Sequence, residues 1–229
     1  MLDKSSYSIS LGNTHQDGII SSTGMDRYNV KVSADTKLTN NWSSGFTANY
    51  ITTSIDKAVT SGNGLLRTVY AAPPSYDLAG IPSHVDGNPY TQNSFRGSFD
   101  NAYWAMENNK FTEDTNRFFG NVYTSYQTDF GTTNHKLNAK YMVGVDAYTT
   151  HYVDSYGYGS NTGGGRGQIE NYGWTNATYN SLLTINYDWH INEDWGLNAV
   201  VGNEIIQSNR KKYYCLLYTS PSPRDYAAS

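Results

Sequence analysis

The sequence lacks most of the features that define familiar protein classes. Cys215 is the only cysteine, and the sequence shows no arrangement of supporting residues of the kind that a catalytic thiol requires. Hydrophobic residues make up 38% of the chain, the mean hydropathy is -0.62, and no apolar run approaches the roughly 20 residues of a membrane helix. The net charge is -4, so the composition argues against nucleic-acid binding, which needs a basic face.

The first ten residues, MLDKSSYSIS, lack the basic and apolar regions of a signal peptide, so an exported protein would have its natural start further upstream. Aromatic residues, in contrast, are plentiful at 14%, and Tyr alone occupies 21 positions. A disordered chain would be poor in aromatics. Many Tyr, Gly, Asn, Ser and Thr with few Leu indicate an all-β protein that carries large polar loops.

Residues 27–50, RYNVKVSADTKLTNNWSSGFTANY, alternate between apolar and polar on both sides of a short turn. Val30 and Val32 point to one side and Lys31 and Ser33 to the other, because successive strand side chains point to opposite faces. The stretch therefore predicts a β-hairpin with one apolar face. That face could cover the core of a soluble sandwich or contact the hydrocarbon of a membrane.

Seven alternating segments follow one another, and the connections between them are short and long in strict alternation. Outer-membrane barrels have short periplasmic turns and long external loops, whereas soluble sandwiches mix loop lengths at both ends. The pattern predicts an all-β, antiparallel up-and-down meander that forms a partial segment of a large transmembrane β-barrel. The segments are about Ser5–Thr14, Arg27–Leu38, Trp42–Ser54, Asn116–Phe130, His135–Val153, Ala177–Trp189 and Trp195–Ser208; the long connections are about Gln16–Asp26, Asp56–Thr115 and Asp154–Asn176.

Aromatic residues gather near both ends of these segments, as expected for the two interfacial bands of a membrane barrel. Strand ends also carry aromatics in other β proteins. The residues beside the short turns are Trp42, Phe130, Trp189 and Trp195, and those toward the long connections are Tyr28, Tyr50, Phe118, Tyr148 and Tyr179.

The two ends of the chain bear on its organisation. Seven strands cannot close a membrane barrel, so we expect residues 1–214 to be a fragment of a larger barrel. The run CLLYTSPSPRD, which begins at Cys215, resembles a translated sequencing adapter, and the composition changes there to a Pro/Ser tail. Residues 215–229 are therefore expected to be a non-native tail.

Several stretches resemble a known family: RYNVKVSADTKLTNNWSSGFTANYITTS, NRFFGNVYTSYQTDF, HKLNAKYMVGVDAY and NYGWTNATYNSLLTINYDWHINEDWGLNAVVGNEI. In order and spacing they are similar to the barrel of SusC/RagA-type TonB-linked outer-membrane transporters of Bacteroidota. The resemblance implies import of glycans or peptides across the cell outer membrane, contact with outer-membrane lipid, and a SusD-like surface lipoprotein as partner. It also implies a plug and a TonB-contact segment, neither of which is present, so no functional residue of those parts is carried over.

The 56–115 connection is the best place for ligand binding, because a loop this long without clear periodicity is usually functional or disordered. Its aromatic rings can stack on sugars or peptide groups, and its polar side chains can bond polar edges. The predicted ligand contacts are Arg96, Asp100, Tyr103 and Trp104; the favoured alternative is that they pack the loop itself or meet a neighbouring loop.

No other motif points to chemistry. The glycine-rich run 157–167 lacks the Lys and Ser/Thr of a phosphate loop, and the five histidines are scattered without ligand spacing. No catalytic, cofactor or metal residues are therefore predicted, and the chain is expected not to be an enzyme. The alternatives are a secreted carbohydrate-binding β-sandwich and, behind it, a glycan-cleaving β enzyme.

Overall fold

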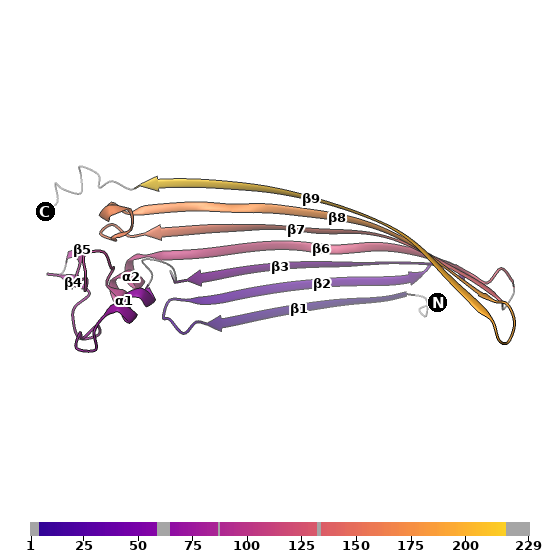
Figure 1. Ribbon diagram of the computed structural model, residues 1–229, viewed down its shortest axis with the longest axis horizontal. Helices are drawn as coiled ribbons and strands as arrows, with labels where there is room; N and C mark the ends of the chain where they lie inside the picture. The colour runs from indigo at the N-terminus through magenta and orange to yellow at the C-terminus, as the bar shows by residue number, and fades with distance from the viewer. Residues whose placement is uncertain (1–4, 59–64, 87, 132–133, 219–229) are drawn as a thin grey trace.

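The computed structural model describes residues 5–58, 65–86, 88–131 and 134–218. Seven long strands form one antiparallel sheet in which each strand pairs with the next long strand along the chain, so the predicted up-and-down meander is confirmed (Figure 1). The strands in order are β1 (Ser5–Asp17), β2 (Gly24–Lys37), β3 (Trp42–Lys57), β6 (Lys110–Thr128), β7 (His135–Tyr156), β8 (Gln168–His190) and β9 (Gly196–Tyr218).

The register gives this sheet two different faces, because residues paired directly across antiparallel strands share a face. One row runs Phe46, Val122, Val143, and these three side chains are 41%, 59% and 46% exposed. Along β6 such rows follow one another from Phe118 to Tyr126, a stretch of nine residues that we call the apolar band. A membrane strand needs about 9–11 residues. We call this side the apolar face and the opposite side the polar face.

Most strands are longer than the alternation predicted, and nearly all of the additional length lies at the long-loop end of the sheet. β7 continues to Tyr156 and β8 begins at Gln168, which leaves an 11-residue connection, 157–167, where a loop from Asp154 to Asn176 was predicted. The connection between β1 and β2 is likewise only residues 18–23. Beyond the apolar band both faces carry polar residues, so the alternation disappears while the backbone hydrogen bonds of the sheet continue.

The predicted aromatic bands are largely on the apolar face. Tyr50 pairs with Phe118 there, and Trp42 pairs with Tyr126 at the opposite end of the same face. Phe130 and Trp195 lie in turns, and among the predicted residues within the strands Tyr148 is the exception. It pairs with Arg117 on the polar face, so it cannot belong to an aromatic band on the apolar side.

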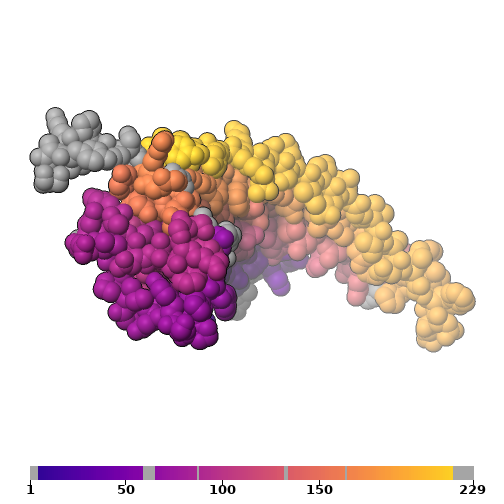
Figure 2. Space-filling model, turned by 60° about the vertical axis from the view of Figure 1, so that its left-hand side comes forward, coloured from indigo at the N-terminus to yellow at the C-terminus, as the bar shows by residue number. Residues whose placement is uncertain are grey.

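The connection between β3 and β6 folds into a small unit of its own at the long-loop end of the sheet (Figure 2). We call its described residues, 65–86 and 88–109, the loop unit. Trp104 is fully buried in it, beside the buried residues Phe99 and Ala102. The elements of the loop unit are α1 (Leu65–Ala71), β4 (His84–Val85), β5 (Asn88–Gln92) and α2 (Ala102–Asn108), and a short 3-10 helix, η1 (Thr162–Gly165), lies in the connection between β7 and β8.

The loop unit meets the sheet on the polar face. Phe111 at the start of β6 is 7% exposed, and its ring contacts Tyr156 of β7 at 5.1 Å between centroids. Leu65, Ala105 and Met106 line a cavity of about 30 Å³ with these two aromatics. Neither seven-residue helix, nor any other helix in the described ranges, has the length and hydrophobicity needed to cross a bilayer.

Candidate functional site: the polar face near the long loops

Aromatic side chains line the polar face near the long-loop end. Tyr152 of β7 and Tyr172 of β8 are register partners, and their rings stack with centroids 4.9 Å apart and an interplanar angle of 7°. The Trp174 ring lies 5.2 Å from Tyr152, and the Tyr214 ring lies 6.2 Å from Tyr172. These four residues form what we call the aromatic ladder, a continuous stacking surface across three strands.

Three carboxylates border the aromatic ladder, and we call them the acidic patch: Asp154 and Glu170 lie on the side nearer the long loops, and Glu113 lies beside Tyr152 on the neighbouring strand β6. Glu113 is the register partner of Tyr152, and Asp154 is the register partner of Glu170. Tyr172 donates its hydroxyl to Asp154 over 3.1 Å. A neutral donor stabilises a carboxylate but leaves its negative charge in place.

One cation is already held at this edge of the aromatic ladder. The Lys57 ammonium lies 3.3 Å from the Glu113 carboxylate and 4.3 Å from the centroid of the Tyr152 ring. Glu170 instead accepts a hydrogen bond from the Tyr214 hydroxyl over 3.3 Å. The acidic patch therefore combines carboxylates and ring faces in the geometry that binds organic cations.

Two cations, the basic pair, lie on β9 at the other edge of the aromatic ladder. Lys212 is the register partner of Trp174, and the Arg210 guanidinium lies 4.9 Å from the centroid of the Trp174 ring. Both are exposed. A nearby cation on the same face, Arg117, forms a two-bond pair with Asp146 at 2.8 and 2.6 Å, so its charge is neutralised locally.

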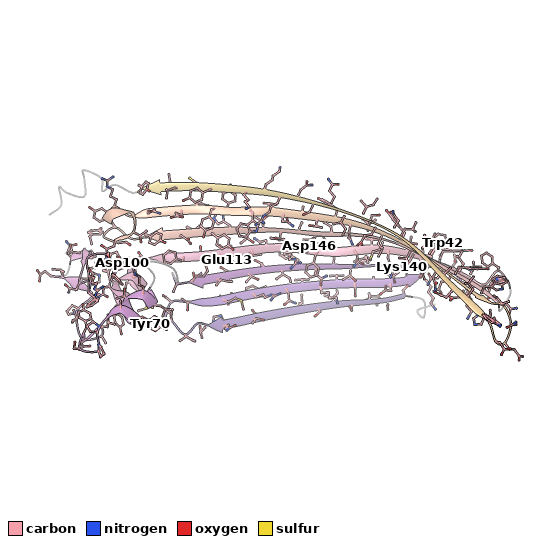
Figure 3. The ribbon with its side chains drawn as sticks, in the orientation of Figure 1. Trp42, Tyr70, Asp100, Glu113, Lys140 and Asp146 are labelled. Carbon is pink, nitrogen blue, oxygen red and sulfur yellow. The ribbon has the colours of Figure 1, made fainter. Side chains whose placement is uncertain are left out.

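Charge changes sign along the polar face as a result. Figure 3 shows Glu113 nearer the loop unit and Asp146 and Lys140 progressively further along the sheet. Glu170 and Trp174 are four residues apart on β8, or about 13 Å, and Glu170 and Asn176 are six apart, or about 20 Å. Lys212 is the register partner of Trp174, and Arg210 is the register partner of Asn176. The two members of the basic pair are therefore about 13 and 20 Å from Glu170 along the strand direction.

Two tyrosines beside the acidic patch are held in their protonated form. Burial raises the pKa of Tyr156 to about 12, with Asp154 contributing, and burial together with Asp154 raises the pKa of Tyr172. Both residues lie beyond the apolar band, toward the long loops. They therefore remain hydroxyl donors at neutral pH.

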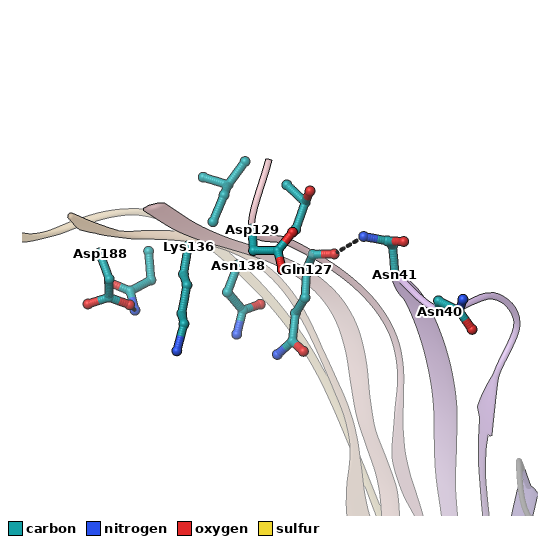
Figure 4. Close-up of a pocket in the computed structure, with 10 residues that line it drawn as sticks. Asn40, Asn41, Gln127, Asp129, Lys136, Asn138 and Asp188 are labelled. Atoms are coloured by element: carbon teal, nitrogen blue, oxygen red, sulfur yellow. Dashed lines mark hydrogen bonds between the residues drawn. The ribbon is translucent and has the colours of Figure 1, made fainter. Parts of the chain in front are cut away.

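A second hollow lies on the polar face at the short-turn end, with a volume of about 520 Å³ (Figure 4). Lys136, Asn138 and Asp188 point to the same side of the strands there. Asn41 donates its side-chain amide to the Gln127 carbonyl over 2.7 Å at the rim. Amides and a few charges line this hollow, and it holds no aromatic ladder.

The four residues predicted as ligand contacts occupy two kinds of position. Asp100 is 3% exposed and both its oxygens are engaged: Ser160, the Asn161 backbone and side chain, and Gln92 donate to it at 2.6 to 2.9 Å. The bonds from Ser160 and Asn161 join the loop unit to the connection between β7 and β8, and the bond from Gln92 is internal to the loop unit. Figure 3 shows Asp100 inside the loop unit.

Trp104 is fully buried and donates its ring N–H to the Pro89 carbonyl over 2.8 Å. Arg96, in contrast, is exposed and lies over the rings of Phe95 and Phe99, and Tyr103 is 42% exposed. Ligand contact by the four stays a prediction. Arg96 and Tyr103 are the two whose side chains are accessible.

The aromatic ladder and its charged borders escaped the sequence analysis because most of their residues lie outside the predicted strands. Tyr172, Trp174 and the acidic patch fall where loops were predicted, and the basic pair and Tyr214 lie beyond the last predicted strand. A signal was present: aromatic and acidic residues alternate with period two at Tyr152, Asp154 and Tyr156, and again at Glu170, Tyr172 and Trp174. This is strand periodicity in which the intervening residues, Val153, Ser155, Asn171 and Gly173, do not form a continuous aliphatic row. Within the described ranges, no group of three or more His, Cys, Asp or Glu side chains is arranged to hold a metal ion.

The sequence matches no family model and no curated protein. Among solved structures, the chain is similar to the RagAB peptide importer in its closed-closed state, with 13% identity and a TM-score of 0.76 over 96% of this chain. For the open-open state the identity is 15% and the TM-score 0.71 over 95%. The chain spans 24% of those neighbours' length. At this identity the likeness establishes the fold, an antiparallel meander that matches part of a β-barrel wall.

Proposed function

We propose that the chain is part of the wall of an outer-membrane, TonB-dependent transporter that imports nutrients such as glycans or peptides. The observation that carries the proposal is the exposed apolar face. The apolar band is nine residues long on β6 and continues across the neighbouring strands. An exposed apolar surface of this extent needs a membrane or protein partner. The polar face then lines the interior of the barrel, and the long loops lie outside the cell.

The edges of the sheet support the same proposal. Within the described residues β1 and β9 each pair with only one neighbouring strand. In a bilayer every backbone group must be paired, so a barrel wall of this kind needs further strands to close it. The likeness to a quarter of a RagAB importer chain is consistent with a wall segment of a larger barrel.

The proposed partners follow from the family resemblance together with this fold. They are outer-membrane lipid on the apolar face, a SusD-like surface lipoprotein at the long loops, and TonB acting through a plug. Arg96 and Tyr103 are proposed as direct ligand contacts in the loop unit, with Asp100 and Trp104 at the base that holds them. No catalytic step is assigned to the chain.

A secreted carbohydrate-binding β-sandwich is the weaker alternative. A sandwich buries the apolar face of one sheet beneath a second sheet. In the part of the chain that the structure describes, the second sheet is the two-stranded β4–β5 pair in the loop unit, which leaves the apolar face uncovered.

Fractionation of cells that express the full-length gene tests the proposal. We expect the protein in the outer-membrane fraction, soluble only in detergent, with a mobility on electrophoresis that changes on heating as folded barrels do. Recovery in the soluble fraction without detergent would contradict it. Uptake of labelled glycan and peptide mixtures by the same cells, with and without the transporter, then reports whether the protein imports either class.

A further inference from the structure

We infer that the aromatic ladder, with the acidic patch and the basic pair at its two edges, binds an extended oligopeptide by its two charged ends. The ammonium end lies at the acidic patch and the carboxylate end at the basic pair. This inference rests on the proposed function, because it assigns a cargo to the interior of the barrel wall. It goes further in naming the residues that select the cargo and the direction in which the cargo lies.

The ammonium end is argued from a contact that the protein makes with itself. Lys57 places an alkylammonium between the Glu113 carboxylate and the Tyr152 ring face, at 3.3 and 4.3 Å. Asp154 and Glu170 border the same rings and receive hydrogen bonds from neutral tyrosine hydroxyls. Their charges therefore attract a second ammonium group, that of the cargo.

The carboxylate end is argued from β9. Lys212 and Arg210 lie on the same face, two residues apart and exposed, beside the Trp174 ring. A guanidinium held over an indole ring is oriented, so less freedom is lost when it binds a carboxylate. The pair provides a strong site for one anionic group next to a stacking surface.

The separation of the two ends sets the length of the cargo. Counted along β8 from Glu170, the register partner of Asp154, the two residues of the basic pair lie about 13 and 20 Å away. An extended peptide spans about 3.3–3.6 Å per residue, so four to six residues bridge the two ends. The aromatic ladder lies between them, where peptide groups and apolar side chains can stack.

Charge distinguishes this cargo from glycans. A neutral glycan stacks on aromatic rings but has no groups that match either charged edge. A polyanionic glycan suits the basic pair but is repelled by the carboxylates of Asp154 and Glu170. An oligopeptide with free termini is complementary to both edges at once.

The test uses the full-length transporter in cells and measures uptake of a tritiated pentapeptide with free termini. Its N-acetylated, C-amidated and doubly capped forms are compared, together with peptides of three and nine residues. In the wild type we expect each cap to reduce uptake on the order of tenfold at low concentration, since a charged hydrogen bond is lost at one end. We also expect the pentapeptide to be favoured over the two other lengths.

Paired variants assign each end. R210Q with K212Q should lower uptake of the free pentapeptide and abolish the preference for a free carboxylate, while the preference for a free ammonium persists. D154N with E170Q should do the reverse. Lys37→Gln and Glu204→Gln are matched controls, because both residues lie on the polar face outside the two charged edges. Both controls should preserve both preferences.

The outcomes separate the inference from the function on which it rests. Failure of the wild type to reach the outer membrane or to import any cargo contradicts the proposed function. Import that is indifferent to both caps, or preferences unchanged in the paired variants, overturns this inference while the importer stands. Competition by a neutral glycan but not by the pentapeptide identifies a different occupant and also overturns it. If a double variant does not assemble, the single variants R210Q and D154N measure the same preferences.

Discussion

The sheet and the loop unit place their apolar side chains in opposite environments. In the sheet, Val122 and Val201 are 59% and 68% exposed, whereas in the loop unit Trp104 is fully buried and Phe99 is 7% exposed. The buried apolar core of the described chain is therefore in a connection and at its junction with β6, not in the sheet that makes up most of the molecule. The sheet must obtain its apolar partner from outside, and the loop unit supplies its own.

The largest effect is expected from emptying the core of the loop unit. Trp104→Ala removes a fully buried indole and its bond to the Pro89 carbonyl, at a cost of about 3–5 kcal/mol of local stability. In the proposed outer-membrane barrel, protease added to intact cells should then cut the loop unit while the barrel keeps its heat-dependent mobility. Tyr70→Ala in α1 is the control, because Tyr70 is 83% exposed. Loss of the barrel together with the loop unit would show that the two regions are not independent.

A charge on the sheet should separate its two faces. Val32→Lys places an ammonium on the apolar face, where a lysine at mid-bilayer costs about 2–4 kcal/mol. The amount of assembled protein in the outer membrane should fall. Ser33→Lys is the matched control: its register partner is Thr47, on the polar face, so assembly should be preserved. Equal tolerance at both positions would undo the assignment of the faces.

A methyl group on the apolar face tests how closely its strands approach. A Cβ on Gly120 would lie 2.3 Å from the Thr47 backbone oxygen, so Gly120→Ala must shift one strand. We expect a loss of about 1–3 kcal/mol, seen as a lower midpoint for unfolding in denaturant. Gly97→Ala, in the connection, meets nothing within 4 Å and should leave the midpoint nearly unchanged. Similar midpoints for both variants would mean that the strands adjust freely.

The smallest effect is expected at the junction between the loop unit and the connection that follows β7. Asp100→Asn keeps the shape but replaces one accepting oxygen by a donor, which faces a donor from Ser160 or Asn161. The expected cost is about 1–3 kcal/mol, measured as faster hydrogen exchange at the Asn161 amide. Asp77→Asn, whose carboxylate accepts from the Gly80 amide at an exposed turn, should leave that exchange unchanged. Unchanged hydrogen exchange at the Asn161 amide in Asp100→Asn would show that other contacts hold this junction together.

The sequence predicted the sheet well where aliphatic and polar residues alternate. Val30, Lys31, Val32 and Ser33 lie on the faces that their order in the chain predicted. Alternation is a local property, and a strand of period two converts it directly into two faces. The three short turns and the order of the strands followed from the same pattern.

The prediction was wrong where alternation fades but pairing continues. Tyr172 and Trp174 were placed in a loop, and they are part of β8, opposite Tyr152 and Thr150 of β7. Their strand is held by hydrogen bonds to neighbours that are distant along the chain, which single-residue patterns do not record. The same limit applies to Asp100, whose partners at Ser160 and Asn161 lie about 60 residues away.

The sequence by itself determined which side of each strand is apolar, how the strands are connected, and that the chain has an all-β fold. Those properties depend on neighbours along the chain. Only the tertiary structure decided that the predicted ligand residues Asp100 and Trp104 are buried, and that the aromatic ladder meets carboxylates at one edge and Lys212 at the other. These properties arise from pairing and packing between residues far apart along the chain, and such contacts exist only once the chain is folded.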